Sequence, residues 1–95
     1  MQREAKFCDV AATRGDERLY AEAKGRTTDA GLDVDTLYGQ LLRRIPADGL
    51  KYDLGVVVPT NAVGAALRVD RHVRAQLGIT VFEVTDEGQV RTVSE

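Results

Sequence analysis

Two carboxylates and a lysine near the start of the chain have the residue types and the spacing for chemistry on a charged substrate. Asp9 is followed after twelve residues by Glu22, and Lys24 comes two positions later. Gly15 lies midway between them, where a two-residue hairpin turn favours glycine. With that turn, side chains alternate along both arms so that Asp9 faces Glu22. Lys24 shares their face of the hairpin.

Directly opposed carboxylates repel each other and lie with their Cβ atoms about 4.5–5.5 Å apart. Such a pair needs a cation or a shared proton. Mg²⁺ prefers oxygen ligands, takes one or two carboxylates and completes its shell with water or phosphate. Lys24 would then orient a water or stabilise charge on a phosphate. The other interpretation is that Asp9, Glu22 and Lys24 are simply the wet face of a hairpin.

The periodicity of the sequence predicts the elements that position these residues. Strands are expected over 6–13, 18–24, 54–58, 79–84 and 89–93, and helices over 34–45 and 61–76. Asp33 or Asp35 is expected to cap the first helix and Pro46 to end it, and Gly78 stops the second. The run 54–58 is apolar throughout, as in a strand buried on both faces. The order β-β-α-β-α-β-β predicts an α/β fold, a mixed sheet with flanking helices and right-handed crossovers.

The residues resemble the PD-(D/E)XK superfamily, the restriction-endonuclease-like nucleases, in its Mrr-like and RecB-like branches. The resemblance spans about 7–84 and lies in Asp9, in Glu22-Ala23-Lys24-Gly25 and in a following helix that bears Gln40. It implies hydrolysis of DNA phosphodiester bonds with Mg²⁺ or Mn²⁺. Asp9 and Glu22 match the metal ligands and Lys24 the catalytic lysine. Ala23 would offer its carbonyl to the metal, and Gln40 would support the site or contact nucleic acid.

The chain departs from that family at its start. The family core usually begins with a helix that often carries a further acidic residue, and here only Glu4 could stand in. Cys8 stands where the motif has proline. We interpret residues 1–95 as one restriction-endonuclease-like domain that lacks this helix. Three explanations stay open: the chain is the C-terminal part of a longer protein, a second copy of the chain covers that side of the sheet, or the fold is trimmed and inactive.

Composition excludes several other classes of site. The chain has 95 residues, one His, one Cys, 13 Lys and Arg, 15 Asp and Glu, and a net charge of −2. These counts exclude a disulfide framework, a zinc site of the cysteine or histidine type and a histone-like polycation. No apolar run approaches the ~20 residues of a membrane span, and no signal peptide is evident. We therefore expect a cytoplasmic protein without a membrane partner.

Arginines are the candidates for binding nucleic acid. Arg43 and Arg44 end the first predicted helix, where they suit the helix dipole or contact phosphate beside Gln40. A second set falls at intervals of three on the second helix and would form one ridge, either a solvated face or a stripe that contacts the DNA backbone. Its members are Arg68, Arg71 and Arg74.

Three further residues have weaker signals. His72 is interpreted as a surface histidine and Cys8 as a small buried hydrophobe on the face opposite Asp9. Tyr20 shares the face of Glu22 and either borders the site or packs in the core. Three functions follow from these patterns: a metal-dependent nuclease, a DNA- or protein-binding module on the same fold that does not cut, and a structural or dimerisation domain.

Overall fold

A β-hairpin opens the part of the chain that the computed structural model describes, residues 7–25 and 29–94. Strand β1 (Phe7–Arg14) pairs antiparallel with β2 (Glu17–Lys24) around a turn at Gly15 and Asp16. Gly15 has a φ of 61°, a left-handed conformation that favours glycine and suits a two-residue hairpin turn. The predicted hairpin is therefore confirmed; Lys6, its predicted first residue, lies outside the described residues.

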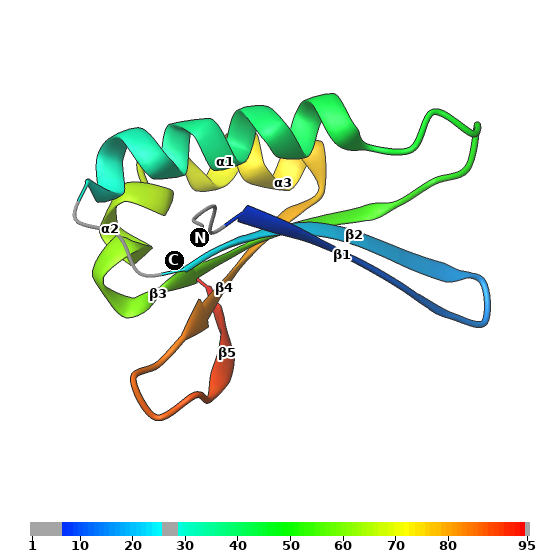
Figure 1. The fold of residues 1–95 in the computed structure, drawn as a ribbon. Helices are drawn as coiled ribbons and strands as arrows, with labels where there is room; N and C mark the ends of the chain where they lie inside the picture. Colours follow the sequence, from blue (N-terminus) through cyan, green and yellow to red (C-terminus); the bar gives the residue numbers. More distant parts are fainter. Residues whose placement is uncertain (1–6, 26–28, 95) are drawn as a thin grey trace, which may run out of the picture.

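The hairpin is one edge of a five-stranded sheet with the spatial order β1-β2-β3-β4-β5. Strand β2 pairs in parallel with β3, and β3 in parallel with β4, while the two outer strands run antiparallel to their neighbours. This confirms the α/β class and the mixed sheet. The tip of the hairpin projects beyond the sheet at the right of Figure 1, because β2 pairs with β3 only from Leu19 onward. The remaining strands are β3 (Asp53–Pro59), β4 (Ile79–Val84) and β5 (Val90–Val93).

Helix α1 (Ala30–Arg44) begins four residues before the predicted start. Its N-cap is Asp29, whose side chain accepts a hydrogen bond from the backbone N–H of Leu32 at 3.2 Å. The predicted caps at Asp33 and Asp35 were wrong, because those residues already lie inside the helix. An N-cap carboxylate satisfies a backbone donor that the first turn otherwise leaves unpaired.

The second predicted helix, 61–76, is broken into three short pieces. They are the 3₁₀ turn η1 (Thr60–Ala62) and helices α2 (Val63–Ala66) and α3 (Arg71–Leu77). Asp70 caps α3, and Gly78 ends it with a φ of 71°, as the glycine signal predicted. Within the described ranges, no helix is both long and apolar enough to cross a membrane.

The core lies between one face of the sheet and the helices, which lie on the same side of it in Figure 1. Alternate residues of the central strands point into this layer, such as Leu54, Val56 and Val58 of β3. No described helix covers the opposite face. On that face Gly55 is buried and Val57 is half-buried, so the expectation of a strand buried on both faces is confirmed only in part. The apolar face of α1 fills the layer with Val34, Leu37, Tyr38 and Leu41.

Candidate active site

Asp9 and Glu22 occupy directly opposed positions of the hairpin, as their spacing predicted. Glu22 is fully buried between the sheet and α1, whereas Asp9 on the edge strand is exposed. The negative charge of Asp9 still acts on the buried Tyr20, since it is one of the causes that raise the pKa of that hydroxyl. The structure thus sets a buried and an exposed carboxylate on the same face of two paired strands.

Each oxygen of the Glu22 carboxylate has a protein partner. The hydroxyl of Tyr20 donates to Oε2 at 2.5 Å, and Nη1 of Arg44 lies 3.4 Å from Oε1. Burial, the hydrogen bond to Glu22 and the charges of Glu22 and Asp9 together raise the pKa of Tyr20 to about 12, against the opposing charge of Arg44. Tyr20 therefore remains a protonated donor at neutral pH. It packs in the hydrophobic core, as one of its two sequence interpretations proposed, and its hydroxyl contacts Glu22.

Lys24 follows on the same face and is almost completely buried. Its Nζ lies 3.8 Å from Oδ2 of Asp33, an acidic residue in the first turn of α1. Burial disfavours a lone ammonium, so a carboxylate beside it keeps the charge tolerable. Asp33 was proposed from the sequence only as a cap, and its pairing with Lys24 depends on where α1 crosses the sheet.

One stripe of α1 faces the buried residues of β2. Asp33, Leu37, Gln40 and Arg44 recur at helical spacing, with Asp33 beside Lys24 and Arg44 beside Glu22. Gln40 lies between Leu37 and Arg44 on this stripe. Its Oε1 is buried and accepts no hydrogen bond from the described residues. An unsatisfied buried oxygen costs free energy, so Gln40 carries an acceptor that a bound ligand could use.

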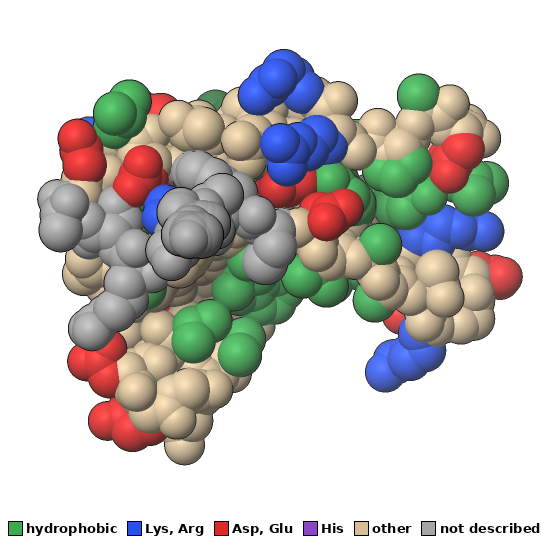
Figure 2. All heavy atoms as spheres, in the orientation of Figure 1, with side chains coloured by type: hydrophobic (Ala, Val, Ile, Leu, Met, Phe, Trp, Pro, Cys, Tyr) green, Lys and Arg blue, Asp and Glu red, His purple; other side chains and the backbone are tan. Residues whose placement is uncertain are grey.

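Arg43 and Arg44 lie at the C-terminal end of α1. Arg43 is exposed, and Arg44 has about half of its side chain exposed even though it reaches Glu22. Figure 2 shows basic side chains on the outer surface of α1 and acidic side chains below them, toward the hairpin. Because Arg43 is exposed and Arg44 half-exposed, both are accessible to an anionic ligand.

Ala23 occupies the position between the two buried charges. Its backbone pairs with Cys8 on one side and Val57 on the other, so its carbonyl belongs to the plane of the sheet. The side chain of Cys8 lies outside the described residues, as does Glu4. Of the acidic residues that the sequence pattern proposed for the site, Asp9 and Glu22 are therefore the two whose positions the structure describes.

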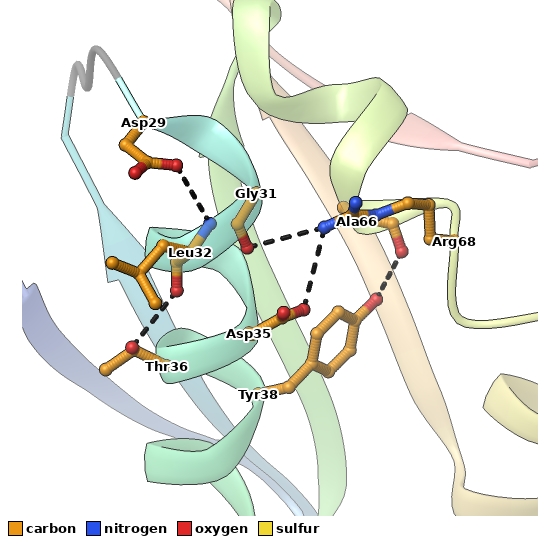
Figure 3. Close-up of polar contacts among 8 residues, drawn as sticks. All are labelled: Asp29, Gly31, Leu32, Asp35, Thr36, Tyr38, Ala66 and Arg68. Atoms are coloured by element: carbon orange, nitrogen blue, oxygen red, sulfur yellow. Dashed lines mark hydrogen bonds and ion pairs between the residues drawn. The ribbon is translucent and has the colours of Figure 1, made fainter.

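The predicted ridge of Arg68, Arg71 and Arg74 does not exist. Arg68 lies after α2, where its guanidinium contacts the Gly31 carbonyl at 3.4 Å and Asp35 at 3.7 Å (Figure 3). Arg74 is buried and donates from Nε to the Val69 carbonyl at 2.8 Å. The break between α2 and α3 separates residues that a continuous helix would align.

Figure 3 also shows how α1 is fixed against α2. The Tyr38 hydroxyl donates to the Ala66 carbonyl at 2.8 Å, deep in the interface. Arg68 contacts Gly31 and Asp35 of α1 from the segment after α2, so it has a structural role beside this contact. His72, at the start of α3, is exposed as predicted.

A second buried glutamate on the sheet escaped sequence reasoning. Glu83 accepts hydrogen bonds from the Thr60 hydroxyl at 2.7 Å and from Nε of Arg91 at 2.9 Å, which lower its pKa, the hydroxyl most strongly. Its partner on β5 is Arg91, an opposite charge. Glu22 instead faces Asp9, a like charge. The alternation of β4, with Ile79 and Val81 on the same face, was the signal for Glu83.

The residues at this site offer a hard divalent cation two carboxylates, so most of its ligands would have to come from water or substrate. Among the described residues, no group of three His, Cys, Asp or Glu side chains could hold a metal. Asp9 and Glu22 could supply two carboxylates, a number that Mg²⁺ commonly takes from a protein. The buried oxygen of Gln40 is a further acceptor on the stripe of α1 that faces β2.

A cavity of about 640 Å³ lies away from these residues, between the hairpin tip and the beginning of β4. Of the candidate residues, Arg74 lines this cavity, whereas Asp9, Glu22 and Lys24 do not. The candidate site lies where β1, β2 and α1 meet.

Comparison with known proteins assigns no family. No protein-family model, no curated protein and no solved structure matches the chain. The resemblance described above therefore depends on the residues that carry it.

Proposed function

We propose that this chain is a metal-dependent nuclease domain that hydrolyses DNA phosphodiester bonds, with Mg²⁺ or Mn²⁺ held by Asp9 and Glu22. The observation that carries the proposal is the pairing of two carboxylates at opposed positions of the hairpin, with Lys24 on the same face. Opposed carboxylates destabilise a hairpin, and a cation between them reverses the sign of that interaction. Glu83, by contrast, is neutralised by Arg91 across the strand pair.

Each residue has a role that its position supports. When bound, the metal ion would polarise a phosphoryl oxygen and lower the pKa of a bound water. Lys24, held beside Asp33, would orient that water and stabilise negative charge on the phosphate. Gln40 would use its buried oxygen for the metal shell or the substrate. Arg43 and Arg44 would hold the nucleic-acid backbone through charge-assisted hydrogen bonds.

The architecture supports a restriction-endonuclease-like core. A hairpin bears the acidic pair, the next helix bears Gln40, and β3 pairs in parallel with the strand that bears Glu22 and Lys24.

A second candidate is a DNA- or protein-binding module on the same fold that does not cut. It is favoured by the contacts of Glu22, since Tyr20 and Arg44 already engage both of its oxygens. Glu83 has the same kind of partners, a hydroxyl and an arginine, in a position where they only join β5 and η1 to the sheet. By that comparison Glu22 would be another structural carboxylate.

Cleavage assays on the purified full chain separate the two candidates. Plasmid DNA, linear DNA and RNA are incubated with Mg²⁺, Mn²⁺ or EDTA, for the wild type and for Asp9→Asn, Glu22→Gln and Lys24→Met. The nuclease proposal expects metal-dependent DNA products that each substitution lowers by about 100-fold or more.

The matched controls alter similar residues outside the site. Glu83→Gln changes the other buried glutamate, Asp53→Asn an exposed aspartate and Lys51→Met an exposed lysine. These variants should cut like the wild type. Cleavage that survives all three site substitutions would refute the assignment, and retarded DNA migration without products would favour the binding module.

A further inference from the structure

The three tyrosines of the chain all donate their hydroxyls, but to different kinds of acceptor. Tyr38 donates to the backbone carbonyl of Ala66 at 2.8 Å, and Tyr52 to the surface carboxylate of Asp48 at 2.7 Å. Tyr20 donates to Oε2 of Glu22 at 2.5 Å, the shortest of the three contacts. Only this hydroxyl reaches a residue of the candidate active site.

The Tyr20–Glu22 contact restricts the position of the carboxylate. The two residues lie two positions apart on β2, so both side chains point from the same face of the sheet into the layer below α1. Tyr20 is 4% exposed and Glu22 is not exposed at all. Interiors are close-packed, so a rotamer change at either side chain would require its neighbours to move. The hydroxyl therefore determines which oxygen of Glu22 points where.

The other oxygen of Glu22 is held more loosely. Its partner is Arg44, at 3.4 Å, and half of the Arg44 side chain is exposed to water. A long contact to a half-exposed arginine gives way to a divalent ion more easily than a buried 2.5 Å hydrogen bond does. The two oxygens are thus unequal, with Oε2 fixed and Oε1 open to exchange.

We propose that Tyr20 is a positioning residue, whose hydroxyl holds Oε2 of Glu22 so that Oε1 is the oxygen presented to a divalent cation. This inference rests on the proposed function, since it assigns a role to Tyr20 at the same metal site. Residues that orient a metal ligand commonly contribute 10–100-fold to metal affinity. A purely structural hydroxyl would contribute to stability and leave the affinity unchanged.

Calorimetric titration of the full chain with MnCl₂ at fixed pH tests the proposal. The variants are Tyr20→Phe, with Tyr38→Phe as the control for a buried hydroxyl and Tyr52→Phe as the control for a hydroxyl on a carboxylate. Tyr20→Phe should weaken Mn²⁺ binding by about 10–100-fold, and both controls should bind within about twofold of the wild type. Equal affinity in folded Tyr20→Phe and in the wild type would overturn the assignment.

A second measurement serves if Tyr20→Phe fails to fold. The full chain is produced with 3-fluorotyrosine, and its three ¹⁹F resonances are assigned with the two control variants. Saturating Mg²⁺ should shift the Tyr20 resonance and leave those of Tyr38 and Tyr52 unchanged. Binding of Mg²⁺ without a shift at Tyr20 would overturn the proposal.

Failure of this inference can be told apart from failure of the proposed function. If the wild type takes up no Mn²⁺, the metal site itself is refuted and the role of Tyr20 with it. If the wild type binds Mn²⁺ and Tyr20→Phe binds equally well, only the positioning role is refuted. Loss of affinity in Tyr20→Phe alone supports both.

Discussion

Replacement of Asp9 by asparagine is expected to stabilise the protein when no divalent ion is present. The substitution keeps the size of the side chain and removes one of two like charges at opposed positions of the hairpin. Two unit charges about 5 Å apart repel by about 0.8 kcal/mol in water, and by more where one of them is buried, as Glu22 is. That figure agrees with the range of about 0.2–1 kcal/mol for cross-strand pairs. Arg44, beside Glu22, offsets part of the repulsion and lowers the expected gain within that range.

Thermal unfolding makes this gain measurable. In a domain of this size, 1 kcal/mol shifts Tm by about 4–8 °C, so a gain of about 0.5 kcal/mol raises it by about 2–4 °C in EDTA. Divalent ions should reverse the order. A ligand at 100 times its Kd stabilises the folded state by about 2.7 kcal/mol, and Asp9→Asn would lose most of that gain. Asp53→Asn, at an exposed position on the other face of the sheet, is the control and should respond to neither condition.

Two results would refute this reasoning. Asp9→Asn would be no more stable than the wild type in EDTA, or its Tm would rise with Mg²⁺ as much as that of the wild type. The first result would mean that the carboxylates do not interact. The second would mean that Asp9 holds no metal ion.

Two further predictions concern the rest of the sheet. Glu83→Gln should reduce the loss of stability in acid. The pKa of Glu83 is lowered in the folded state, so its ionised form stabilises the fold above the unfolded pKa of about 4.3, and this contribution is lost as pH falls through the folded pKa. Urea unfolding between pH 6 and 3 measures the difference, and parallel curves for the two proteins would contradict it. Gly55→Ala should lower the free energy of unfolding by about 1–3 kcal/mol, because a Cβ there would lie 2.8 Å from the ring of Phe82 and 3.3 Å from Cβ of Ala21. Urea unfolding should show a smaller loss when Phe82 is also replaced by leucine. Equal losses would show that the ring does not cover the glycine.

The hairpin was the most predictable part of the fold. A two-residue turn fixes the pairing of both arms, so Gly15 at the turn was sufficient to place Asp9 opposite Glu22. The alternation of side chains then placed Lys24 on the same face. These are local rules, and they need no knowledge of what packs above the sheet.

The helices were less predictable because their ends depend on local polar contacts. The first turn of α1 contains Gly31 and an exposed Leu32, so apolar periodicity does not reach back to the cap at Asp29. Asp70 was the visible signal for a second start, since aspartate is a favoured N-cap, yet the apolar pattern runs across the break. Because one continuous helix was predicted over 61–76, Arg68, Arg71 and Arg74 were wrongly expected to form one ridge.

The contacts of the candidate site depend on tertiary packing. That Tyr20 and Glu22 share a face follows from their spacing, but Arg44 meets Glu22 only because α1 crosses β2 in one particular position. The same crossing brings Asp33 to Lys24 and buries the oxygen of Gln40. No periodicity in the chain specifies that crossing, so the sequence predicted which candidate residues share a face of the hairpin but not the partners that α1 brings to them.

A crystal of the full chain soaked in MnCl₂, with anomalous data collected near the manganese edge, would show whether Asp9 and Glu22 bind a divalent ion together. We expect an anomalous peak coordinated by both carboxylates, with Arg44 withdrawn from Glu22 and Tyr20 still in place. Carboxylates that point apart, with Glu22 contacting only Tyr20 and Arg44 and no peak between the strands, would contradict it.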